Sequence, residues 1–530
     1  MFGNPFSHRL PPGSYEKFLE SGNLSFLYRP ELFDLVILLI YFGVLIFLSA
    51  YGLRRFYYLH LFRKHRHERV APAGHFEEPP MVTVQLPMYN EMYVGPRILN
   101  SACQLDYPKD KLHIQVLDDS TDETVGIMQQ AVAYWTDRGF DVEYIHRTNR
   151  GGFKAGALEN GLRTAKGDIV AIFDADFVPH SDFLQRTVHH FTDPRVAIVQ
   201  TRWTHLNGDY SLLTRAQTLF LDGHFMMESL PRARAGLFVN FNGTAGLWRK
   251  QAIADAGGWS HDTITEDLDL SLRAQMKGWK FVYLPEIECP AELPVEMNAF
   301  KNQQNRWAKG STQVCLKMLG PILRAPLPRP VKTEAVFHLT ANFAYPLMVL
   351  LSLVLLPSII VRFHQGIWEM LVLDLPIFVA STLSVALFYI HSQKALYTDW
   401  KERVRLLPFL MALGIGLTVT NGKAVIEAVL GIKSAFVRTP KYHVTGRKDS
   451  WLRKKYRGKI GIWPLVEIAF GCFFTWVFGY CVAIGNFGVL PFLLLFIVGY
   501  FYTGFSSLFH NLLKFPFVDM QYRRLRALLD

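Results

Sequence analysis

Four short clusters of acidic, amide or aromatic residues follow one another through the middle of the chain. They are Asp118-Asp119, Asp174-Ala175-Asp176, Thr265-Glu266-Asp267 and the run from Gln303 to Trp307. Each of the first two closes an apolar run rich in β-branched residues, so each is expected at the end of a buried strand. Open α/β sheets bind their ligands at the carboxyl ends of parallel strands. A carboxylate pair there suits a divalent cation that also holds phosphate oxygens.

The Asp174-Ala175-Asp176 cluster predicts a metal site. Two carboxylates two residues apart at a strand end repel each other unless a cation lies beside them. Mg²⁺ or Mn²⁺ is expected, because both ions prefer oxygen ligands; an acid pair on the surface is the alternative. A glycine-rich segment, 151–156, lies between the two acidic strand ends and contains Lys154. Its flexible backbone and single cation before a helix predict a contact with a diphosphate.

The run from Met81 to Glu91 predicts a first strand, then a loop and a helix. In that loop, Tyr89 is suited to stack on a nucleotide base and Glu91 to accept a hydrogen bond from it. An ordinary strand-to-helix turn with a capping asparagine explains the same residues. Asp118 and Asp119 are open to the same two interpretations, because a strand-terminal Asp before Ser-Thr-Asp-Glu also makes a good helix cap.

A glycine-rich loop and the third acidic cluster point to a place where an acceptor reacts. The loop Phe241–Gly246 is poor in side chains, which lets a flat sugar ring approach the backbone; a simple turn is the alternative. Asp267 is a candidate general base, which must come within hydrogen-bond reach of the acceptor hydroxyl. On the local sequence alone, a helix cap is the better explanation of Asp267 or Thr265.

The segment from Asn298 to Leu319 predicts a helix that places Gln303, Arg306 and Trp307 on one face. Arg306 is suited to offset the charge of a departing diphosphate. Trp307 offers a flat surface on which a sugar ring can stack. Trp and Arg serving as anchors beside a membrane is the alternative interpretation.

The composition indicates an integral membrane protein with a large soluble domain. Of the 530 residues, half are hydrophobic and only 19% are charged. The net charge of +11 is more than accounted for by two segments, 53–69 and 431–460. Both flank apolar runs, where basic residues mark the cytosolic side of a membrane. We exclude nucleic acid as a partner, because no binding module accompanies the charge. The five cysteines form no CxxC pair, so neither a zinc site nor a disulfide frame is expected.

Five apolar segments are long enough to cross a bilayer. They lie at 32–51, 337–361, 371–391, 462–484 and 488–511. A sixth, at 406–430, contains polar residues, and if it crossed the membrane the basic segment 431–460 would lie outside. We therefore expect 406–430 along the interface, with the amino terminus outside and the carboxyl terminus in the cytosol. Residues 82–322 alternate short strands with amphipathic helices, which predicts one α/β domain.

The expected domain order follows from these segments. It comprises an extracytosolic segment (1–31), a span (32–52), a basic cytosolic linker (53–81), the α/β domain ending in an interfacial helix (82–322), two spans (323–403), an interfacial helix with a loop (404–461), two spans (462–512) and a cytosolic tail (513–530).

Taken together, the ordered clusters resemble the processive, membrane-integrated glycosyltransferases of family 2, the cellulose-synthase-like group. The resemblance is closest to the glucomannan 4-beta-mannosyltransferases, or cellulose-synthase-like A proteins, and to their bacterial relatives. It extends across about residues 82–320. Beside the clusters it is carried by the phrases Val116–Asp122, Phe153–Leu158, Phe241–Gly246 and Gly278–Phe281.

The resemblance implies a Rossmann-like GT-A catalytic domain in the cytosol, inserted in an α-helical transmembrane bundle, and inversion at the anomeric carbon. It implies Asp267 as the base, with Glu266 beside it, and Mg²⁺ or Mn²⁺ on Asp174 and Asp176. The implied nucleotide-binding residues are Tyr89, Glu91, Asp118, Asp119, Lys154, Asp174, Gln303 and Arg306, and the implied acceptor-binding residues are Asn242, Gly243, Thr244 and Trp307. The stretch Phe436–Lys441 resembles the gating loop of cellulose synthases, which adds Thr439 and Lys441 to the nucleotide site.

The expected function is the polymerisation of a β-linked hexose, as β-mannan, glucomannan or β-glucan with β-1,4 linkages, and its secretion across the membrane. GDP-mannose, GDP-glucose and UDP-glucose are all open as donors, and the growing glycan and the lipid bilayer are the other partners; protein partners are left open. The membrane is expected to be a bacterial inner or plasma membrane or that of the Golgi.

Two other functions compete with the polymerase. One is a non-processive glycosyltransferase acting on a lipid, such as a ceramide or a polyprenyl phosphate, which shares the acidic clusters. The other is a transporter or scaffold with an inactive domain, against which the intact acidic clusters argue. No large domain follows the last predicted span, so control by a cyclic dinucleotide is not expected.

Overall fold

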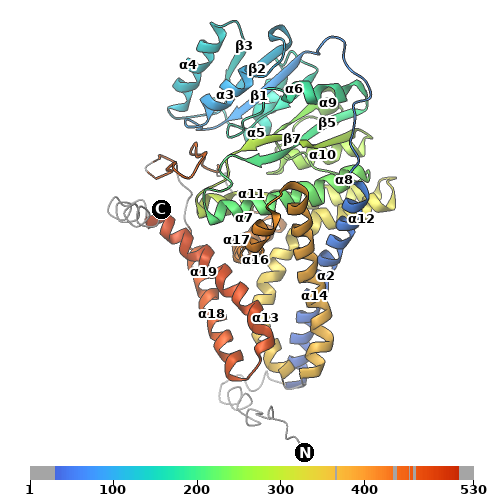
Figure 1. Ribbon diagram of the computed structural model, residues 1–530, viewed down its shortest axis with the longest axis vertical. Helices are drawn as coiled ribbons and strands as arrows, with labels where there is room; N and C mark the ends of the chain where they lie inside the picture. The colour runs from blue at the N-terminus through green and yellow to red at the C-terminus, as the bar shows by residue number, and fades with distance from the viewer. Residues whose placement is uncertain (1–29, 364–366, 434–437, 453, 457–460, 513–530) are drawn as a thin grey trace, which may run out of the picture.

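The computed structural model describes residues 30–363, 367–433, 438–452, 454–456 and 461–512. An α/β domain stands on a bundle of long helices (Figure 1). The predicted segment 1–31 and tail 513–530 lie almost or wholly outside the described residues, as do Phe436 and Val437 of the predicted gating loop.

A seven-stranded sheet in the order β3-β2-β1-β4-β6-β5-β7 forms the centre of the α/β domain. The strands are β1 (Val82–Met88), β2 (Leu112–Asp118), β3 (Asp141–His146), β4 (Ile169–Ile172), β5 (Val196–His205), β6 (Gly246–Arg249) and β7 (Lys280–Ala291). β1 to β4 pair in parallel, and β6 is antiparallel to both of its neighbours. Every residue of β1, β2 and β4 is buried, as expected of parallel strands that helices cover on both faces.

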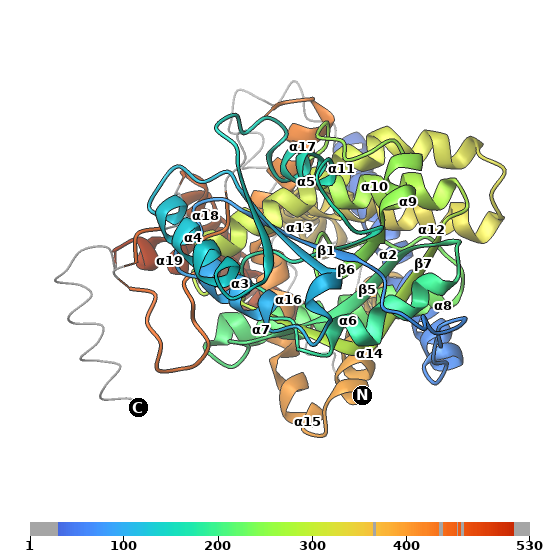
Figure 2. The same ribbon diagram turned by 90° about the horizontal axis from the view of Figure 1, so that it is seen from above.

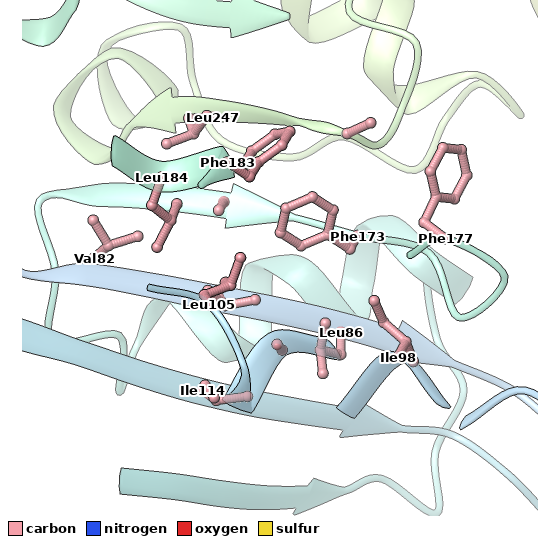
Figure 3. Packing of buried hydrophobic residues seen from close by; sticks show 14 of the residues in the cluster. Val82, Leu86, Ile98, Leu105, Ile114, Phe173, Phe177, Phe183, Leu184 and Leu247 are labelled. Carbon is pink, nitrogen blue, oxygen red and sulfur yellow. The ribbon is translucent and has the colours of Figure 1, made fainter. Parts of the chain in front are cut away.

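Helices pack on both faces of the sheet. One face is covered by α3 (Gly95–Cys103), α4 (Thr124–Thr136) and α6 (Phe183–Thr187), and the other by α5 (Phe153–Leu162), α9 (Lys250–Asp255) and α10 (Glu266–Met276). On the first face, Leu86, Ile98, Phe173 and Phe183 belong to one buried cluster (Figure 3). This core fixes the positions of the strand ends that carry the acidic clusters.

A layer of helices separates the sheet from the bundle (Figure 1). It contains α7 (Leu212–Gly223), a π-helical turn (His224–Ser229), α8 (Leu230–Arg234) and α11 (Met297–Arg324), and α12 (Arg329–Thr340) follows it. The helix predicted from Asn298 to Leu319 is thus confirmed as part of α11. Viewed from above, the strands lie over the long helices (Figure 2).

The long helices run away from the α/β domain (Figure 1). They are α2 (Pro30–His65), α13 (Ala344–Phe363), α14 (Ile367–Leu396), α18 (Trp463–Ala483) and α19 (Leu490–Leu512), with the short α15 (Trp400–Arg403) after α14. Within the described residues, four helical stretches are long and apolar enough to cross a membrane: Leu32–His65, Arg329–Val361, Trp463–Ala483 and Phe487–His510. They coincide with four of the five predicted spans. The fifth, 371–391, falls in α14, part of whose side chains lies outside the description.

The segment 406–430 is two helices rather than one. α16 (Leu407–Gly416) and α17 (Thr418–Val429) meet at a bend of 43°. At the end of α16, a Cβ on Gly416 would lie 2.4 Å from the carbonyl oxygen of Gly499, so α16 packs directly on the backbone of α19. Polar residues of α17 are in contact with protein: Thr420 and Asn421 are buried, and Glu427 Oε2 lies 2.9 Å from Lys309 Nζ of α11. The bent pair has the geometry of either a broken span or a re-entrant segment, and the sidedness of the chain stays a prediction.

Candidate active site

The carboxyl ends of β1, β2 and β4 bring the first acidic clusters to one edge of the sheet. Asp118 is the last residue of β2, and Asp174 follows β4 by two residues. The backbone N–H of Asp119 donates to the carbonyl of Met88 at 3.0 Å, which joins the two strand ends. The site predicted at this edge is therefore assembled from segments far apart in sequence.

Lys154 joins the glycine-rich loop to the strand-end acids. Its Nζ donates to Asp174 Oδ1 at 2.5 Å and to the carbonyl of Gly243 at 2.9 Å. The N–H of Asp174 donates to Thr244 Oγ1 at 2.8 Å. Burial raises the pKa of Asp174, although Lys154 opposes this effect. Burial by itself would lower the pKa of Lys154, but Asp174 and the α10 acids raise it, so the lysine stays charged.

Asp176 is paired with Lys441, from the loop that follows α17. The two side chains are almost buried, and Lys441 Nζ lies 2.6 Å from Asp176 Oδ2. The same ammonium donates to the carbonyl of Glu292. A positive group therefore already occupies the position beside Asp176 where a bound cation would balance its charge.

The donor set at Asp174 and Asp176 fits a divalent cation. In the part of the chain that the structure describes, no group of three or more His, Cys, Asp or Glu side chains is arranged to hold a metal. Two carboxylates are nevertheless enough for Mg²⁺ or Mn²⁺ when substrate phosphates and water complete the shell, which is how Mg²⁺ is usually held at phosphate sites. A fully protein-built metal cage is not what this edge offers.

Glu266 and Asp267 form the first turn of α10. Burial raises the pKa of Glu266 to about 7 and that of Asp267 to about 6. These values are near those required of a general base at neutral pH. Of the two residues that the sequence offered as a helix cap, Thr265 is at the N-cap position, but its side chain makes no capping hydrogen bond, and Asp267 is not the cap.

Gly243 lets Asp267 and Lys154 approach the loop Phe241–Gly246. A Cβ at Gly243 would lie 2.9 Å from Asp267 Oδ2 and 3.5 Å from Lys154 Nζ, and the residue has φ +80°. A glycine is needed there both for space and for the left-handed backbone. Thr244 is fully buried, so its hydroxyl serves to hold the backbone of Asp174.

Tyr89 and Glu91 are held in place by two arginines. The guanidinium of Arg150 lies 3.3 Å from the centre of the Tyr89 ring. Arg438 Nη1 donates to the carbonyl of Tyr89 at 2.9 Å and lies 3.3 Å from Glu91 Oε2. Burial raises the pKa of Glu91 to about 7, although Arg438 opposes this shift.

Asp118 and Asp119 have partners inside the protein. Asp118 is fully buried and accepts hydrogen bonds from the Tyr144 hydroxyl and the Ser120 N–H, each at 2.8 Å. Asp119 receives two hydrogen bonds from Arg147, at 2.8 and 2.5 Å. Neither aspartate is the N-cap of α4, which is Glu123.

Arg306 and Trp307, predicted to lie on one face of α11 with Gln303, have different neighbours in the structure. Arg306 Nη2 donates to Thr439 Oγ1 at 2.8 Å. Burial lowers the pKa of Arg306 to about 10, while Asp174 and Glu266 oppose this, so the guanidinium is charged and close to the acidic site. Trp307 packs against the apolar cluster around Tyr58, and Gln303 is half-buried.

Comparison with known proteins assigns the domain to a family. Residues 79–310 match the family described as glycosyltransferase like family 2. The chain is 36% identical over 421 residues to probable glucomannan 4-beta-mannosyltransferase 7 of Oryza sativa subsp. japonica, covering 76% of this chain and 69% of that protein. The chain belongs to glycosyltransferase family 2. The predicted resemblance to the glucomannan 4-beta-mannosyltransferase group is confirmed, and the α/β domain is that of a glycosyltransferase enzyme.

Other comparisons cover less of each protein or show the fold alone. Glucomannan 4-beta-mannosyltransferase 9 of Arabidopsis thaliana is 44% identical over 249 residues, and the chain spans 47% of its length. The mannosyltransferase PcManGT from Pyrobaculum calidifontis, solved with GDP-Man and Mn²⁺, is 22% identical and aligns over 74% of this chain and 99% of that one, with a TM-score of 0.52. This likeness confirms the GT-A fold of the glycosyltransferase domain.

Several residues of this glycosyltransferase site were not predicted from the sequence. Arg438 lies within the predicted gating loop but had no role assigned to it. Arg97 Nη2 donates to the carbonyl of Asp176 at 3.2 Å and lies 3.6 Å from Glu292 Oε2. Arg147 was not considered, although it pairs with Asp119. These residues carry no local motif, because their partners come from distant segments.

Proposed function

We propose that this protein is a membrane-integrated, inverting glycosyltransferase that polymerises mannose from GDP-mannose into a β-1,4-linked mannan or glucomannan. The observation that carries the proposal is the contact of Asp267, Lys154 and Asp174 around Gly243. It places a candidate base beside the groups suited to a sugar diphosphate. The names of the relatives, glucomannan 4-beta-mannosyltransferases, support mannose and the linkage.

Positive side chains on two sides of the site bind the diphosphate in this proposal. Lys154 stands at the start of α5, where the helix N-terminus also favours anions. Arg306 faces it from α11, and Thr439 holds that guanidinium in place. Charge develops on the diphosphate as it leaves, and such preorganised donors stabilise that charge. Tyr89 and Glu91, with Asp118 and Asp119 behind them, form the nucleoside end, and Gln303 lies on the same side as Arg306.

Asp174 and Asp176 would hold Mg²⁺ or Mn²⁺ together with the diphosphate oxygens. When bound, such an ion supplies positive charge that neutralises the leaving group. Lys441, from the loop after α17, pairs with Asp176 at 2.6 Å, and with an ion bound at Asp176 its ammonium would be free to contact the diphosphate.

Asp267 removes a proton from the acceptor hydroxyl as that oxygen attacks the anomeric carbon. One displacement on an α-linked donor inverts the configuration and gives a β-linkage. Burial and the charge of Asp267 raise the pKa of the neighbouring Glu266. Asn242, Gly243 and Trp307 border the acceptor. The layer of α7 and α11, which carries Arg306 and Trp307, lies between the sheet and the long helices that would conduct the glycan (Figure 1).

In this proposal the catalytic domain is cytosolic, since the basic segments 53–69 and 431–460 flank apolar segments and basic residues favour the cytosolic side. The membrane itself is a bacterial inner or plasma membrane or the Golgi membrane.

Product analysis with separate donors tests this function. Purified protein in nanodiscs with Mn²⁺ would be incubated with labelled GDP-mannose, GDP-glucose or UDP-glucose. A large product from GDP-mannose that a β-1,4-mannanase degrades is expected. A small product soluble in chloroform would instead show transfer to a lipid, and a large product from UDP-glucose alone would overturn the assignment of mannose.

A further inference from the structure

The turn between α7 and α8 is π-helical, over His224–Ser229. Wide turns of this kind are rare and occur mostly at functional sites. The preceding Gly223 lets α14 come close: a Cβ there would lie 2.5 Å from the Tyr389 ring. The turn is therefore held between the α/β domain and a long helix, and its side chains have fixed surroundings.

His224 and Glu228 form a pair inside this turn. His224 Nδ1 lies 3.0 Å from Glu228 Oε2. Burial by itself would raise the pKa of Glu228, but the hydrogen bond from His224 and the charge of Arg232 lower it to about 2. Glu228 is thus a carboxylate that accepts from the imidazole. Arg232 is fully buried, and its Nε donates to the carbonyl of Glu228 at 3.1 Å, which holds the backbone of the turn in place.

The other ring nitrogen of His224 holds the side-chain oxygen of Asn242. His224 Nε2 lies 3.1 Å from Asn242 Oδ1, and Asn240 Nδ2 donates to the same oxygen at 2.7 Å. The imidazole thus lies between the Glu228 carboxylate and the Asn242 side chain, with one ring nitrogen facing each. The backbone N–H of Asn242 donates to Gln200 Oε1 at 2.9 Å. The amide of Asn242 is fixed at its oxygen and at its backbone.

Asn242 Nδ2 is buried and has no hydrogen-bond partner. A buried donor without a partner costs about 1–3 kcal/mol, and native structures rarely leave one. The residue directly precedes Gly243, which touches Asp267 and Lys154. Asn242 thus carries unpaired N–H groups in the loop whose next residue, Gly243, lies close to the candidate base.

We propose that Glu228 and His224 are positioning residues that orient the Asn242 amide, so that its N–H groups bind a hydroxyl of the acceptor sugar beside Asp267. This inference rests on the proposed transfer to a glycan. The inference goes beyond the proposed function because it assigns the orientation of the acceptor to the π-helical turn His224–Ser229, which lies outside the four acidic clusters. It assigns no role in donor binding to this turn.

Four variants of the full chain in nanodiscs test the proposal: Asn242→Ala, His224→Ala, the double variant and His224→Gln. The readouts are the KM of donor and of β-1,4-mannotetraose, the ratio of donor hydrolysis to transfer, and calorimetric binding of mannotetraose. Loss of one hydrogen bond predicts a KM for mannotetraose raised about fivefold to tenfold in Asn242→Ala, with more hydrolysis and a donor KM within about twofold. His224→Ala should shift the same quantities, and His224→Gln, which keeps a donor, should recover part of the loss.

The double variant decides between positioning and a separate role. If His224 acts through Asn242, the double variant is no worse than Asn242→Ala, because the two effects are not additive. Ser229→Ala is the matched control, since it removes a buried hydroxyl without a partner from the same turn and should behave as wild type. Additive losses, or an equal rise in donor KM, would overturn the proposal.

The binding measurement separates this proposal from the proposed function. If the wild type transfers sugar and all variants match it, only the positioning role fails. If the wild type transfers no sugar, the proposed function fails, and weaker mannotetraose binding by Asn242→Ala and His224→Ala still supports the positioning role. Equal binding by the wild type and both variants overturns it.

Discussion

The ion pair of Lys441 and Asp176 leads to a prediction that tests whether Asp176 also binds a metal ion. In the substitution Lys441→Met, the Asp176 carboxylate loses the ammonium that lies 2.6 Å away, while both side chains are almost buried. Two unit charges at that distance attract by about 6 kcal/mol at an effective dielectric constant of 20. Desolvation of the pair offsets part of this, and breaking a buried pair typically costs about 3–5 kcal/mol.

A loss of that size should be visible in thermal unfolding. For a domain of the length of the α/β domain, residues 82–322, a loss of about 3–5 kcal/mol corresponds to a melting temperature lowered by roughly 6–12 °C in the presence of EDTA. Mn²⁺ with GDP would place a cation beside Asp176 and replace the lost charge, so the deficit should shrink to a few degrees. The assay is thermal unfolding of the detergent-solubilised protein, with and without Mn²⁺ and GDP.

The matched control is Lys455→Met. Lys455 also pairs with a carboxylate at 2.6 Å, that of Glu123, but both side chains are at least half exposed. Exposed pairs contribute little, so its melting temperature should stay near that of the wild type. A deficit in Lys441→Met that is the same with and without Mn²⁺ and GDP would refute the reasoning that Asp176 receives the metal.

Three further predictions concern the reacting end of the site. Because burial raises the pKa of Asp267 to about 6 and a base must be ionised, transfer should be constant above that pH and fall roughly tenfold for each pH unit below it; a kcat that is flat down to pH 5 would exclude Asp267 as the base. Gly243→Ala introduces a Cβ 2.9 Å from Asp267 Oδ2 at φ +80°, so initial rates should fall at least about tenfold with the protein still folded; a wild-type rate would contradict the close approach. Thr439→Val removes the hydroxyl that accepts from Arg306, which should raise the donor KM roughly fivefold, as one lost hydrogen bond predicts; an unchanged donor KM in steady-state kinetics would separate that hydroxyl from the nucleotide site.

The sequence predicted the parts of the site that depend on local order. Asp118 and Asp174 were expected at one edge because parallel strands end there, and Lys154 was expected before a helix in the segment between them, where it contacts Asp174. Asp267 at the start of a helix and Arg306 on the helix before the second span were expected from apolar periodicity. These inferences needed only the direction of each element.

The remaining contacts depend on how distant segments pack, which local pattern does not encode. Lys441 was expected at the nucleotide, yet it reaches Asp176 across 265 positions of sequence. Arg438 reaches the carbonyl of Tyr89, two residues before Glu91, across 349 positions of sequence. The single helix expected over 406–430 bends at Leu417, where α16 packs on the backbone of α19. His224 and Glu228 belong to no motif, because their partner Asn242 comes from another loop.

The most direct test of the account is to separate donor binding from transfer with two variants. Asp267→Asn keeps the shape of the side chain but removes the base, and Lys154→Met removes the cation that faces Asp174. Binding of GDP-mannose by calorimetry and mannose transfer would be measured on both. The account predicts that Asp267→Asn binds the donor as wild type does but transfers nothing, whereas Lys154→Met loses donor binding. Equal loss of binding and transfer in Asp267→Asn, or transfer at the wild-type rate, would contradict it.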